Sequence, residues 1–549
     1  MVTSPTAPPD APDVLNAHRL SDPVWPRRLP REMTFPDAPV HANLAASARL
    51  YPTKVAITAG DRVWTYAQLQ DDVERFAGFL TANGVRAGDR VAVWLQNRPE
   101  YVTAVYGAWR VGAIVSPLSP MLTGDEAPFY FEDSGPSILV TAPALYRKVA
   151  DHPATPALVV LVGDQPEVDS QAVPWAATLS AAPGAAANVA ASDIALLPYT
   201  SGTTGRPKGC VLTHAALQTT LMGAAYWCQH TPASIHFATL PFFHVTGFQQ
   251  SMQVALATGG EMIIMERWDR EEAARIMEER GVTTWVSITA MIVDLLNHLD
   301  ERPRDLSAIR FVAGGGAAIP EDVHRRVRET FGVPLVEGYG LTETISQTHL
   351  NPPDAARERC VGIPTFNVRC VVLDKDDQRA LPAGEVGEIA IHGPQILNEY
   401  WNRPEETAEA FIDIGGLRYF RTGDLGYYDA DGYFYIVDRL KRMINAAGFK
   451  VWPAEVEARL YDHPAVSEAC VVGVGDPKRG ETTRALIILK PDFRGRVTPE
   501  DLIAWSRERM SAYKYPREVV FVDALPRLAS GKVDWRTAQA QENARDGGN

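Results

Sequence analysis

Short β-branched runs alternate with helical patterns of ten or more residues over most of the 549-residue chain, and this alternation is the strongest constraint on its fold. From about Asn43 onward, strand-like runs such as Arg90–Leu95 are followed by amphipathic patterns such as Glu100–Arg110. Strands joined by helices of this length pair in parallel, with the helices as crossovers. The sequence therefore predicts an α/β fold with parallel-type sheets, preceded by an irregular, Pro-rich lead-in over residues 1–40.

Later parts of the chain depart from this rhythm. The runs Cys370–Leu373, Glu388–His392 and Tyr433–Ile436 indicate a more β-rich subdomain. After the charged stretch Asp438–Arg442, about 110 residues follow with a shorter α+β pattern, which is enough for a separate small domain. Residues 540–549 are expected to be frayed. We predict a large N-terminal domain of several subdomains and a small α+β C-terminal domain.

Composition and charge argue against several classes of protein. With 53 basic against 67 acidic residues, the formal charge is −14, which opposes binding to nucleic acid and to anionic membrane surfaces. The five cysteines are scattered without C-x-x-C spacing, as in a reducing compartment and without a disulfide or metal framework. The N-terminus does not read as a signal peptide, and no run approaches the roughly 18 apolar residues of a transmembrane helix. A soluble cytoplasmic protein is predicted.

The stretch Tyr199–Cys210, YTSGTTGRPKGC, places hydroxyl groups, three glycines and a lysine between an apolar run at Ile194–Leu197 and a helical pattern opening at Thr213. Hydroxyls, backbone N–H groups and a basic side chain on a flexible loop suit a polyphosphate. The Walker pattern does not fit this spacing of glycines and lysine. A flexible linker is the alternative, but a linker does not need a lysine in fixed register between apolar strands. We interpret the stretch as a phosphate-binding loop.

Three further stretches hold candidate site residues. GYGLTET (Gly338–Thr344) combines glycines with an aromatic ring, a hydroxyl and a carboxylate, and carboxylate oxygens beside a triphosphate suit Mg²⁺. The second is YFRTGDLGYYDADGYFYIVDRLKRMI (Tyr419–Ile444), and the third is LPRLASGKVDWR (Leu525–Arg536). Taken singly, their residues fit a capped turn, an Asx turn, a surface ion pair or an exposed tail. Their joint occurrence in this order favours a nucleotide site.

Together these motifs resemble the adenylate-forming (AMP-binding) superfamily, which includes acyl-CoA synthetases, luciferases and the adenylation domains of peptide synthetases. The resemblance covers roughly residues 43–540. It implies an N-terminal AMP-binding domain at 1–437, a hinge at 438–441 and a mobile C-terminal domain at 442–549. ATP, Mg²⁺ and coenzyme A are the implied cofactors.

The resemblance assigns the chemical step to a few residues. Lys532 would bridge the attacking carboxylate and the α-phosphate, because a lysine can orient two anions that repel each other. Thr342 would contact phosphate. Glu343 and Thr200 would hold Mg²⁺, and Lys441 would be the hinge residue about which the C-terminal domain rotates.

Nucleotide and CoA contacts follow from the same resemblance. Tyr339 would stack on adenine, Asp424 would bind the ribose hydroxyls, and Arg439 would contact ribose or phosphate. The full set expected to bind ATP or CoA is Thr200, Ser201, Gly202, Thr203, Thr204, Gly205, Lys208, Gly316, Ala317, Ala318, Gly338, Tyr339, Gly340, Asp424, Ile436, Arg439, Gly448 and Lys450.

Two segments are expected to shape the acid and thiol sites. PFFHVTGF (Pro241–Phe248) predicts a turn that opens a helix, and the family uses the position of His244 to shape the acyl pocket near the carboxylate, although a packed turn histidine is the alternative. NAAGFKVWPAEVE (Asn445–Glu457) resembles the segment that turns toward the thiol, with Gly448 and Lys450 lining a pantetheine tunnel. Some relatives carry lysine where this chain has Asn445.

The run Gly314-Gly315-Gly316-Ala317-Ala318 allows two interpretations. Glycines there could simply permit close packing under a helix. The resemblance instead makes the run the adenine wall and part of the acyl pocket, where missing side chains leave room for a long or flat substrate.

The predicted activity is that of an acyl-CoA ligase. A medium- or long-chain fatty acid or an aryl acid would attack MgATP to give acyl-AMP and pyrophosphate, and CoA would then displace AMP. The 17 residues after Lys532 are too few for a fused carrier domain, which favours free CoA as the acceptor. A stand-alone enzyme that passes the acyl group to an amine or a carrier protein, a luciferase, and a nucleotide-binding protein without catalysis are the alternatives. A homodimer is left open, and neither nucleic acid nor a transmembrane segment is expected.

Overall fold

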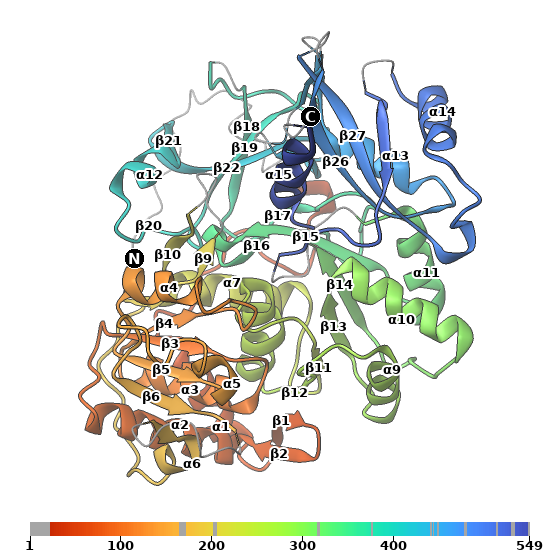
Figure 1. Cartoon of the computed structure of the whole chain (residues 1–549). Coiled ribbons are helices and arrows are strands. Elements are labelled where there is room, and N and C mark those ends of the chain that lie inside the picture. The colour runs from red at the N-terminus through yellow and green to blue at the C-terminus, as the bar shows by residue number, and fades with distance from the viewer. Residues whose placement is uncertain are drawn as a thin grey trace.

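A computed structural model gives the fold for residues 22–163, 172–200, 206–315, 319–374, 377–439, 442, 444–446, 449–476, 480–511, 514–528 and 533–546. Four sheets organise the chain (Figure 1). Two mainly parallel sheets with their helices form the lower and middle part of the view, a smaller antiparallel sheet lies at the upper left, and the C-terminal sheet lies at the upper right. The predicted large N-terminal region with a smaller C-terminal domain is confirmed.

The first sheet is built mostly from parallel strands, as predicted. In spatial order it contains β17 (Ile363–Pro364), β16 (Ser346–Leu350), β15 (Leu335–Leu341), β14 (Phe311–Gly315), β13 (Thr284–Ser287), β11 (Ile235–Ala238), β12 (Glu261–Ile264), β1 (Val55–Ala59) and β2 (Arg62–Thr65). The pairs from β15 to β1 are parallel, whereas β15–β16, β16–β17 and the β1–β2 hairpin are antiparallel.

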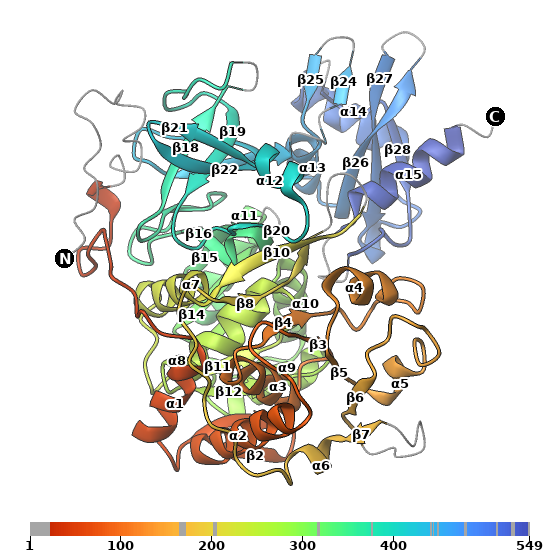
Figure 2. The same ribbon diagram turned by 90° about the vertical axis from the view of Figure 1, so that its left-hand side faces the viewer.

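The second sheet carries the loop motif. In spatial order it contains β20 (Glu399–Tyr400), β10 (Lys208–Thr213), β8 (Ile194–Leu196), β4 (Ile114–Pro117), β3 (Arg90–Trp94), β5 (Ile138–Thr141), β6 (Leu158–Leu161) and β7 (Val173–Pro174), with β9 (Tyr199–Thr200) beside β10. The short strand β20 comes from far along the sequence and adds to the edge of this sheet next to β10 (Figure 2).

Helices fill the space between the two sheets and cover their outer faces. The main core lies between the sheets, and its helical side chains come from α1 (His41–Leu50), α2 (Tyr66–Ala82), α3 (Pro99–Arg110), α7 (His214–Trp227) and α8 (Val254–Ala257). The outer face of the first sheet packs on α9 (Arg270–Glu279), α10 (Thr289–Glu301) and α11 (Glu321–Phe331), and that of the second on α4 (Ala127–Ser134) and α5 (Pro143–Tyr146). A short helix, α6 (Trp175–Thr178), lies at the periphery.

Local sequence signals set many of these boundaries. Thr65 and Gln68 form a capping box, so α2 begins at Tyr66, earlier than the apolar pattern indicates. Asp269 caps α9 by accepting a hydrogen bond from the Glu272 amide. The strand β15 continues into the GYGLTET motif and ends at Leu341, so the first four residues of the motif are strand rather than turn.

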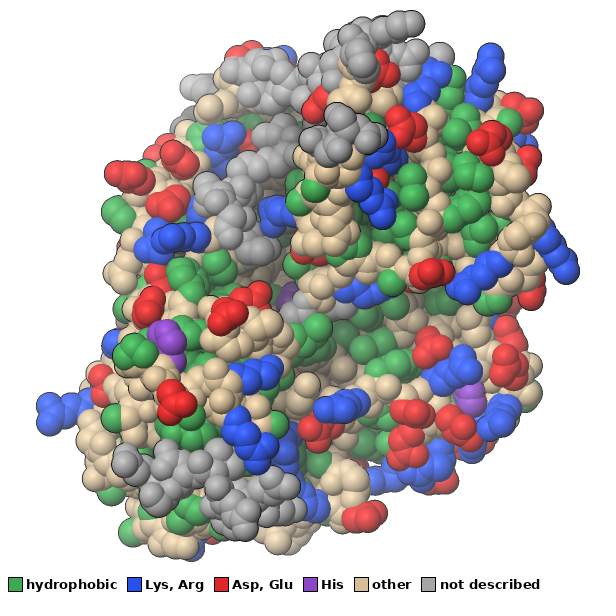
Figure 3. All heavy atoms as spheres, viewed as in Figure 1, with side chains coloured by type: hydrophobic (Ala, Val, Ile, Leu, Met, Phe, Trp, Pro, Cys, Tyr) green, Lys and Arg blue, Asp and Glu red, His purple; other side chains and the backbone are tan. Residues whose placement is uncertain are grey.

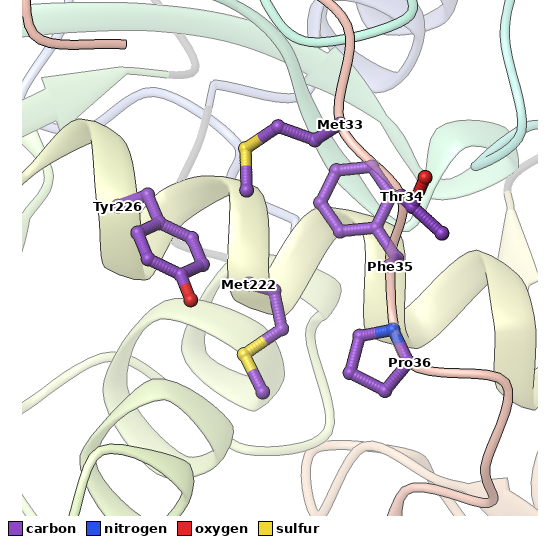
Figure 4. A pocket seen from close by; sticks show the side chains of 6 residues that line it. All are labelled: Met33, Thr34, Phe35, Pro36, Met222 and Tyr226. Carbon is purple, nitrogen blue, oxygen red and sulfur yellow. The ribbon is translucent and has the colours of Figure 1, made fainter. Parts of the chain in front are cut away.

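The lead-in is not merely irregular over its described part. Trp25 is 8% exposed and packs edge-to-face on Trp227 and Phe366, with ring centroids 5.0 and 5.7 Å away. Farther along, the backbone of Met33 exchanges two hydrogen bonds with the side chain of Asn367, at 2.9 and 2.7 Å. Between this segment and α7 lies an open cavity of about 260 Å³, lined by Met33, Thr34, Phe35, Pro36, Met222 and Tyr226 (Figure 4).

The β-rich subdomain predicted after residue 369 is present as an antiparallel sheet. It contains β18 (Arg369–Leu373), β19 (Gly387–His392), β22 (Leu417–Tyr428), β21 (Phe411–Ile414) and β23 (Phe434–Arg439), with α12 (Pro404–Glu409) beside it. The long strand β22 pairs with β19, β21 and β23. It therefore places residues 422–424 (Thr-Gly-Asp) in the middle of the sheet.

The C-terminal part forms an α+β unit. Its sheet contains β24 (Ile444–Ala446), β25 (Phe449–Val451), β26 (Val466–Asp476), β27 (Gly480–Leu489) and β28 (Glu518–Phe521), and its helices are α13 (Pro453–Tyr461), α14 (Pro499–Arg509) and α15 (Trp535–Asp546). The expectation that residues 540–549 are frayed is wrong over 540–546, because these residues continue α15. Glu542 there is 3% exposed and pairs with Arg484 at 3.0 Å.

A hydrogen bond and an ion pair, both made by Asp438, link β23 to this unit. The Asp438 carboxylate accepts a hydrogen bond from the Ala454 amide at 2.7 Å, at the N-terminus of α13. Arg442 lies 3.8 Å from Asp438 and also bonds to Glu457 on α13. Among the residues that the structure describes, no helix is long and apolar enough to cross a membrane. On the face shown in Figure 3, acidic and basic side chains are intermixed.

Candidate active site

The phosphate-loop motif is held at both ends by a small antiparallel ladder. Thr200 on β9 pairs with Lys208 on β10, so the two predicted ligands that flank the loop face each other in register. The Tyr199 hydroxyl donates to Asp133 at 2.8 Å, and Arg403 pairs with the same carboxylate at 2.8 Å. These bonds fix the base of the loop. Ser201, Gly202, Thr203, Thr204 and Gly205 lie outside the described residues.

Lys208 and Glu343 come together on one aromatic side chain, Tyr400. The Lys208 Nζ atom lies 5.1 Å from the centre of the Tyr400 ring, within the range of a cation–π contact. The Tyr400 hydroxyl donates to Glu343 Oε1 at 3.0 Å. Tyr400 reaches this position because β20 pairs with β10 and places it opposite Cys210. The predicted phosphate lysine and the predicted metal ligand therefore converge.

Burial keeps the Tyr400 hydroxyl protonated, so it can donate a hydrogen bond. The side chain is largely shielded from water, and this burial raises its pKa far above the usual value, with the Glu343 carboxylate adding to the effect. Burial also raises the pKa of Cys210, with Glu343 again contributing. Tyr400 therefore stays protonated throughout the working pH range and orients one oxygen of Glu343.

Thr342 and Glu343 lie in a short 3₁₀ turn, Thr342–Thr344, at the end of β15. The Thr344 hydroxyl accepts from the Leu341 amide at 2.9 Å and donates to the Ser346 carbonyl at 2.7 Å, which ties the turn together. The next residue, Ile345, has φ of 46°, and a β-branched side chain is rarely found in this left-handed region. This conformation reverses the chain directly into β16.

Gly340 is required by close packing at this reversal. A Cβ atom there would lie 1.7 Å from the carbonyl oxygen of Ser346 on β16. The same comparison applies to the described glycines of the GGG motif. A Cβ on Gly315 would meet the Gly338 carbonyl at 2.9 Å, and one on Gly314 would meet Ile319 at 2.9 Å. Close packing against a backbone atom thus accounts for Gly315, whereas Gly314 meets only the end of a side chain that can move. Gly316, Ala317 and Ala318 lie outside the described residues.

The predicted adenine and ribose ligands also contact each other. The Tyr339 hydroxyl donates to Asp424 Oδ2 at 2.7 Å, joining β15 of the first sheet to β22 of the β-rich sheet. Asp424 is 2% exposed and pairs in register with Arg439 on β23. Ile436, also on β23, lies at the surface with 36% exposure. Tyr339, Asp424 and the backbone of Arg439 are therefore brought together.

His349 supports Tyr339 from β16. Its ring centroid is 5.6 Å from that of Tyr339 and 4.6 Å from that of Phe434, and the residue is fully buried. Burial lowers the pKa of His349 to about 3, so the ring is neutral. A neutral ring packs under Tyr339 without placing a charge beside Asp424.

His244 occupies a turn at the start of a helical segment, as predicted. Its Nδ1 accepts from the Thr246 amide at 3.4 Å, and the segment that follows, Gly247–Gln253, is a π-helix. The remaining predictions fall on the C-terminal side. Lys441, Gly448 and Lys532 lie outside the described residues, and Lys450 is placed on β25 without a described side chain.

Sequence reasoning missed Tyr400 and His349. Tyr400 has no motif of its own, and only the long-range pairing of β20 with β10 reveals it. His349 is closer to the known motif, since β16 pairs directly with β15, and the alternation of side chains along a strand could have placed it behind Tyr339.

The structure brings Lys208 and Glu343 to one tyrosine, and Tyr339 to Asp424, beside mainly parallel α/β sheets, the class of fold that often binds nucleotides at its strand ends. The comparisons with known proteins are more specific. Residues 44–401 match the AMP-binding enzyme family and residues 455–532 match the AMP-binding enzyme C-terminal domain, so the chain belongs to the AMP-binding enzyme family.

Relatives are similar over nearly the whole chain. A long-chain-fatty-acid–CoA ligase of Bacillus subtilis is 32% identical over 93% of this chain and 95% of the relative. A feruloyl-CoA synthase of an Amycolatopsis species is 34% identical over 88% of this chain and 95% of the relative. Among solved structures, o-succinylbenzoate coenzyme A synthetase of Bacillus subtilis, in complex with ATP and magnesium ion, is 30% identical, has a TM-score of 0.79, and the match covers 92% of this chain and all of that one.

Proposed function

We propose that this protein is an ATP-dependent acid–thiol ligase that makes an acyl-CoA. In the first step a carboxylate oxygen bonds to the α-phosphorus of ATP, and the bond from that phosphorus to the pyrophosphate oxygen breaks. In the second step the sulfur of CoA bonds to the acyl carbon, and AMP leaves. The names of the relatives, two CoA-forming enzymes of a fatty acid and an aryl acid, support this assignment.

One observation carries the proposal. Lys208, from the loop motif, contacts the ring of Tyr400, and Glu343, from the GYGLTET motif, accepts a hydrogen bond from the Tyr400 hydroxyl. A cation and a carboxylate that share one tyrosine fit a magnesium polyphosphate, because the lysine can pair with phosphate oxygens while the carboxylate binds the metal. A structural ion pair would instead place the two charges in direct contact.

Mg²⁺ fits the residues present. Tyr400 holds one oxygen of Glu343, and Thr200 adds a hydroxyl from the strand opposite Lys208. The Glu343 carboxylate and the Thr200 hydroxyl are hard oxygen ligands of the kind that Mg²⁺ prefers, together with phosphate oxygens. When bound, the metal would neutralise charge on the phosphates. Tyr400 and the 3₁₀ turn would keep Glu343 in place.

The acid must approach the α-phosphate against its negative charge. Thr342 lies next to Glu343 and would donate its hydroxyl to a phosphate oxygen. By family likeness, Lys532 would hold the carboxylate and the α-phosphate together in the attacking geometry. On the other side of the nucleotide, Tyr339 would stack on adenine and Asp424 would accept the ribose hydroxyls.

The thiol step is proposed to use a rotation of the C-terminal domain. We infer limits of 1–437 for the N-terminal domain, 438–441 for the hinge and 442–549 for the C-terminal domain, with Lys441 as the residue that rotates. A turn of this kind would bring Gly448 and Lys450 toward the acyl-adenylate. The Asp438–Ala454 hydrogen bond joins the first residue of this hinge to the C-terminal domain and would have to change if the domain turns about Lys441. We also propose that the protein is cytoplasmic. Its five cysteines are all free, as is usual in a reducing compartment.

The test is formation of AMP and pyrophosphate over a panel of fatty acids, benzoates and cinnamates, each with and without CoA. AMP that accumulates catalytically only with CoA supports the ligase. Pyrophosphate release without CoA turnover would point to an amine or a carrier protein as the acceptor. Lys532→Ala is the control variant, and we expect adenylation to fall by orders of magnitude while ATP binding, measured by calorimetry, changes little. Unchanged pyrophosphate release in this variant would remove Lys532 from the mechanism.

A further inference from the structure

Asp133, on the helix α4, bonds to two segments that lie far apart in the sequence. Its Oδ2 atom accepts a hydrogen bond from the Tyr199 hydroxyl at 2.8 Å, on β9, the strand that precedes the phosphate loop. Its Oδ1 atom pairs with Arg403 at 2.8 Å, and its backbone carbonyl accepts from the indole N–H of Trp401 at 3.0 Å. Figure 1 shows α4 next to β9 and β10, the two strands that flank the loop. Asp133 itself belongs to none of the sequence motifs.

On the β9 side, α4 holds Tyr199 by three side chains. Besides its bond to Asp133, the ring of Tyr199 packs edge-to-face on Tyr130, with centroids 4.9 Å apart, and on Phe129, with centroids 6.4 Å apart. Burial raises the pKa of Tyr199 above its usual value, and the Asp133 carboxylate adds to this shift, so the hydroxyl remains a donor. The next residue is Thr200, a proposed ligand of Mg²⁺. The position of Thr200 therefore depends on how α4 holds Tyr199.

On the β10 side, Asp133 is linked to the strand that carries Lys208. The Trp401 amide donates to the carbonyl of Gly209, the residue after Lys208, at 2.8 Å. A Cβ atom on Gly209 would lie 3.2 Å from the Cβ atom of Trp401, so the two segments pack closely. Tyr400, the residue before Trp401, contacts Lys208 with its ring. The bond from Trp401 to the Asp133 carbonyl thus joins α4 to the backbone beside Lys208.

The surroundings of Asp133 make both bonds to its carboxylate necessary. The side chain is 10% exposed, and a carboxylate so shielded from water is costly unless it is paired. Each oxygen has one strong donor, a hydroxyl on β9 and a guanidinium after β20. The carboxylate is therefore satisfied only when β9 and the segment after β20 both lie in this arrangement.

We propose that Asp133 is a positioning residue for the triphosphate of MgATP, because it holds Thr200 and Lys208 at a fixed spacing through their neighbours in the chain. This inference rests on the proposed function. A phosphate-loop lysine and Mg²⁺ act on the phosphates that leave as pyrophosphate, and AMP lacks these phosphates. Asp133 therefore contributes to the binding of MgATP and to the release of pyrophosphate, but not to the binding of AMP or to the attack of CoA.

The experiment compares the Kd for MgATP with the Kd for AMP, both measured by calorimetry in the presence of Mg²⁺. In Asp133→Ala we expect the Kd for MgATP to rise about tenfold, while the Kd for AMP changes by less than about twofold. Asp133→Asn keeps an acceptor for the Tyr199 hydroxyl, so its effect should be smaller. A role in folding alone would move both constants together or lower the number of binding sites. Tyr199→Phe, which removes a single bond, makes the same comparison if Asp133→Ala does not fold.

The two half-reactions give a second measurement. With MgATP and the best acid of the panel, pyrophosphate release by Asp133→Ala should slow by about tenfold or more. Thioester formation from CoA and the chemically prepared acyl-AMP of the same acid should keep the wild-type rate, because pyrophosphate takes no part in that step. An equal slowing of both half-reactions would contradict a role at the triphosphate.

Glu132→Gln is the matched control. Glu132 is the neighbouring acid on α4 and is exposed, so its replacement should leave both Kd values and both half-reactions unchanged. Arg403→Gln removes the other bond of the carboxylate and should raise the Kd for MgATP less than Asp133→Ala does. Equal loss of MgATP and AMP binding in Asp133→Ala, or no loss of either, would overturn the inference and leave the ligase intact. A wild-type protein that binds neither nucleotide and releases no pyrophosphate with any acid would instead refute the proposed function, and this inference with it.

Discussion

The phosphate side and the ribose side of the site are each built on a tyrosine that donates to a carboxylate, but the two tyrosines have different origins. On the ribose side, Tyr339 and Asp424 both belong to predicted motifs, and each is expected to touch the nucleotide. On the phosphate side, Glu343 is a motif residue, whereas Tyr400 comes from a short edge strand outside every motif. We therefore expect Tyr400 to act through Glu343 and Lys208, its two contacts, rather than on a substrate. The comparison separates residues that bind from a residue that positions.

The largest effect should come from Glu343, the proposed metal ligand of the phosphate side. Glu343→Gln keeps the hydrogen bond from Tyr400 but removes the charge that Mg²⁺ needs, so we expect the rate of pyrophosphate release to fall about 100- to 1,000-fold. The Mg²⁺ concentration needed for half-maximal rate should rise as well. Glu399→Gln, next to Tyr400 on the exposed face of β20, is the control and should be neutral. An unchanged Mg²⁺ requirement in Glu343→Gln would move the metal away from this residue.

The corresponding change on the ribose side should cost less and affect a different constant. Asp424→Asn replaces the charged hydrogen bonds to two ribose hydroxyls by neutral ones, each weaker by about 1–1.5 kcal/mol, so KM for ATP should rise roughly tenfold to a hundredfold. The Mg²⁺ requirement should not move, because Asp424 faces Tyr339 and β23 rather than Lys208. Asp413→Asn, on the exposed part of β21, is the control. A drop in kcat at constant KM would contradict a role in ground-state nucleotide binding.

How well the sequence predicts the phosphate side and the ribose side of the site depends on how far apart in the chain the interacting residues lie. The apolar run before Tyr199–Cys210, which forms β8, and the helix that opens after Thr213 depend on neighbours in the chain, and both were predicted. The position of Tyr400 could not be predicted, because it depends on an antiparallel pairing with Cys210, which lies 190 residues earlier in the chain. Strand pairing over such separations leaves no local pattern.

Two local predictions failed because packing overrode propensity. The GYGLTET motif reads as a turn, yet its first residues continue β15, since pairing with β14 and β16 satisfies their backbone groups. The polar tail 540–546 reads as frayed, yet α15 is held by the buried pair of Glu542 with Arg484. In both cases a partner from elsewhere in the fold decides the outcome, and the sequence window alone does not contain it.

Removing the tyrosine hydroxyls tests the comparison directly. Tyr400→Phe deletes the hydrogen bond that orients Glu343 but keeps the ring under Lys208, so we expect the Mg²⁺ requirement to rise about tenfold with little change in KM for ATP. Tyr339→Phe is the matched variant on the ribose side. It keeps the stacking ring, so KM for ATP should rise a few-fold while the Mg²⁺ requirement stays constant. If both variants shift the same constant, the two sides are not separate and the distinction between binding and positioning tyrosines is lost.

The smallest effect on activity should come from His349, which supports only the ribose side. The ring is neutral in the folded protein, where burial lowers its pKa to about 3, but in the unfolded chain it takes up a proton near the ordinary histidine pKa of 6.5. Between about pH 6 and pH 4 the unfolded state therefore binds one more proton, and the free energy of unfolding falls by about 1.4 kcal/mol per pH unit from this residue alone.

His349→Phe should change kcat/KM by less than about twofold, because an apolar ring still packs under Tyr339. Its urea midpoints should fall less steeply on acidification than those of the wild type, whereas the same change at His392, which lies near the surface of β19, should leave the wild-type slope. A slope in His349→Phe equal to that of the wild type would mean that His349 does not enter the folded state as a neutral ring.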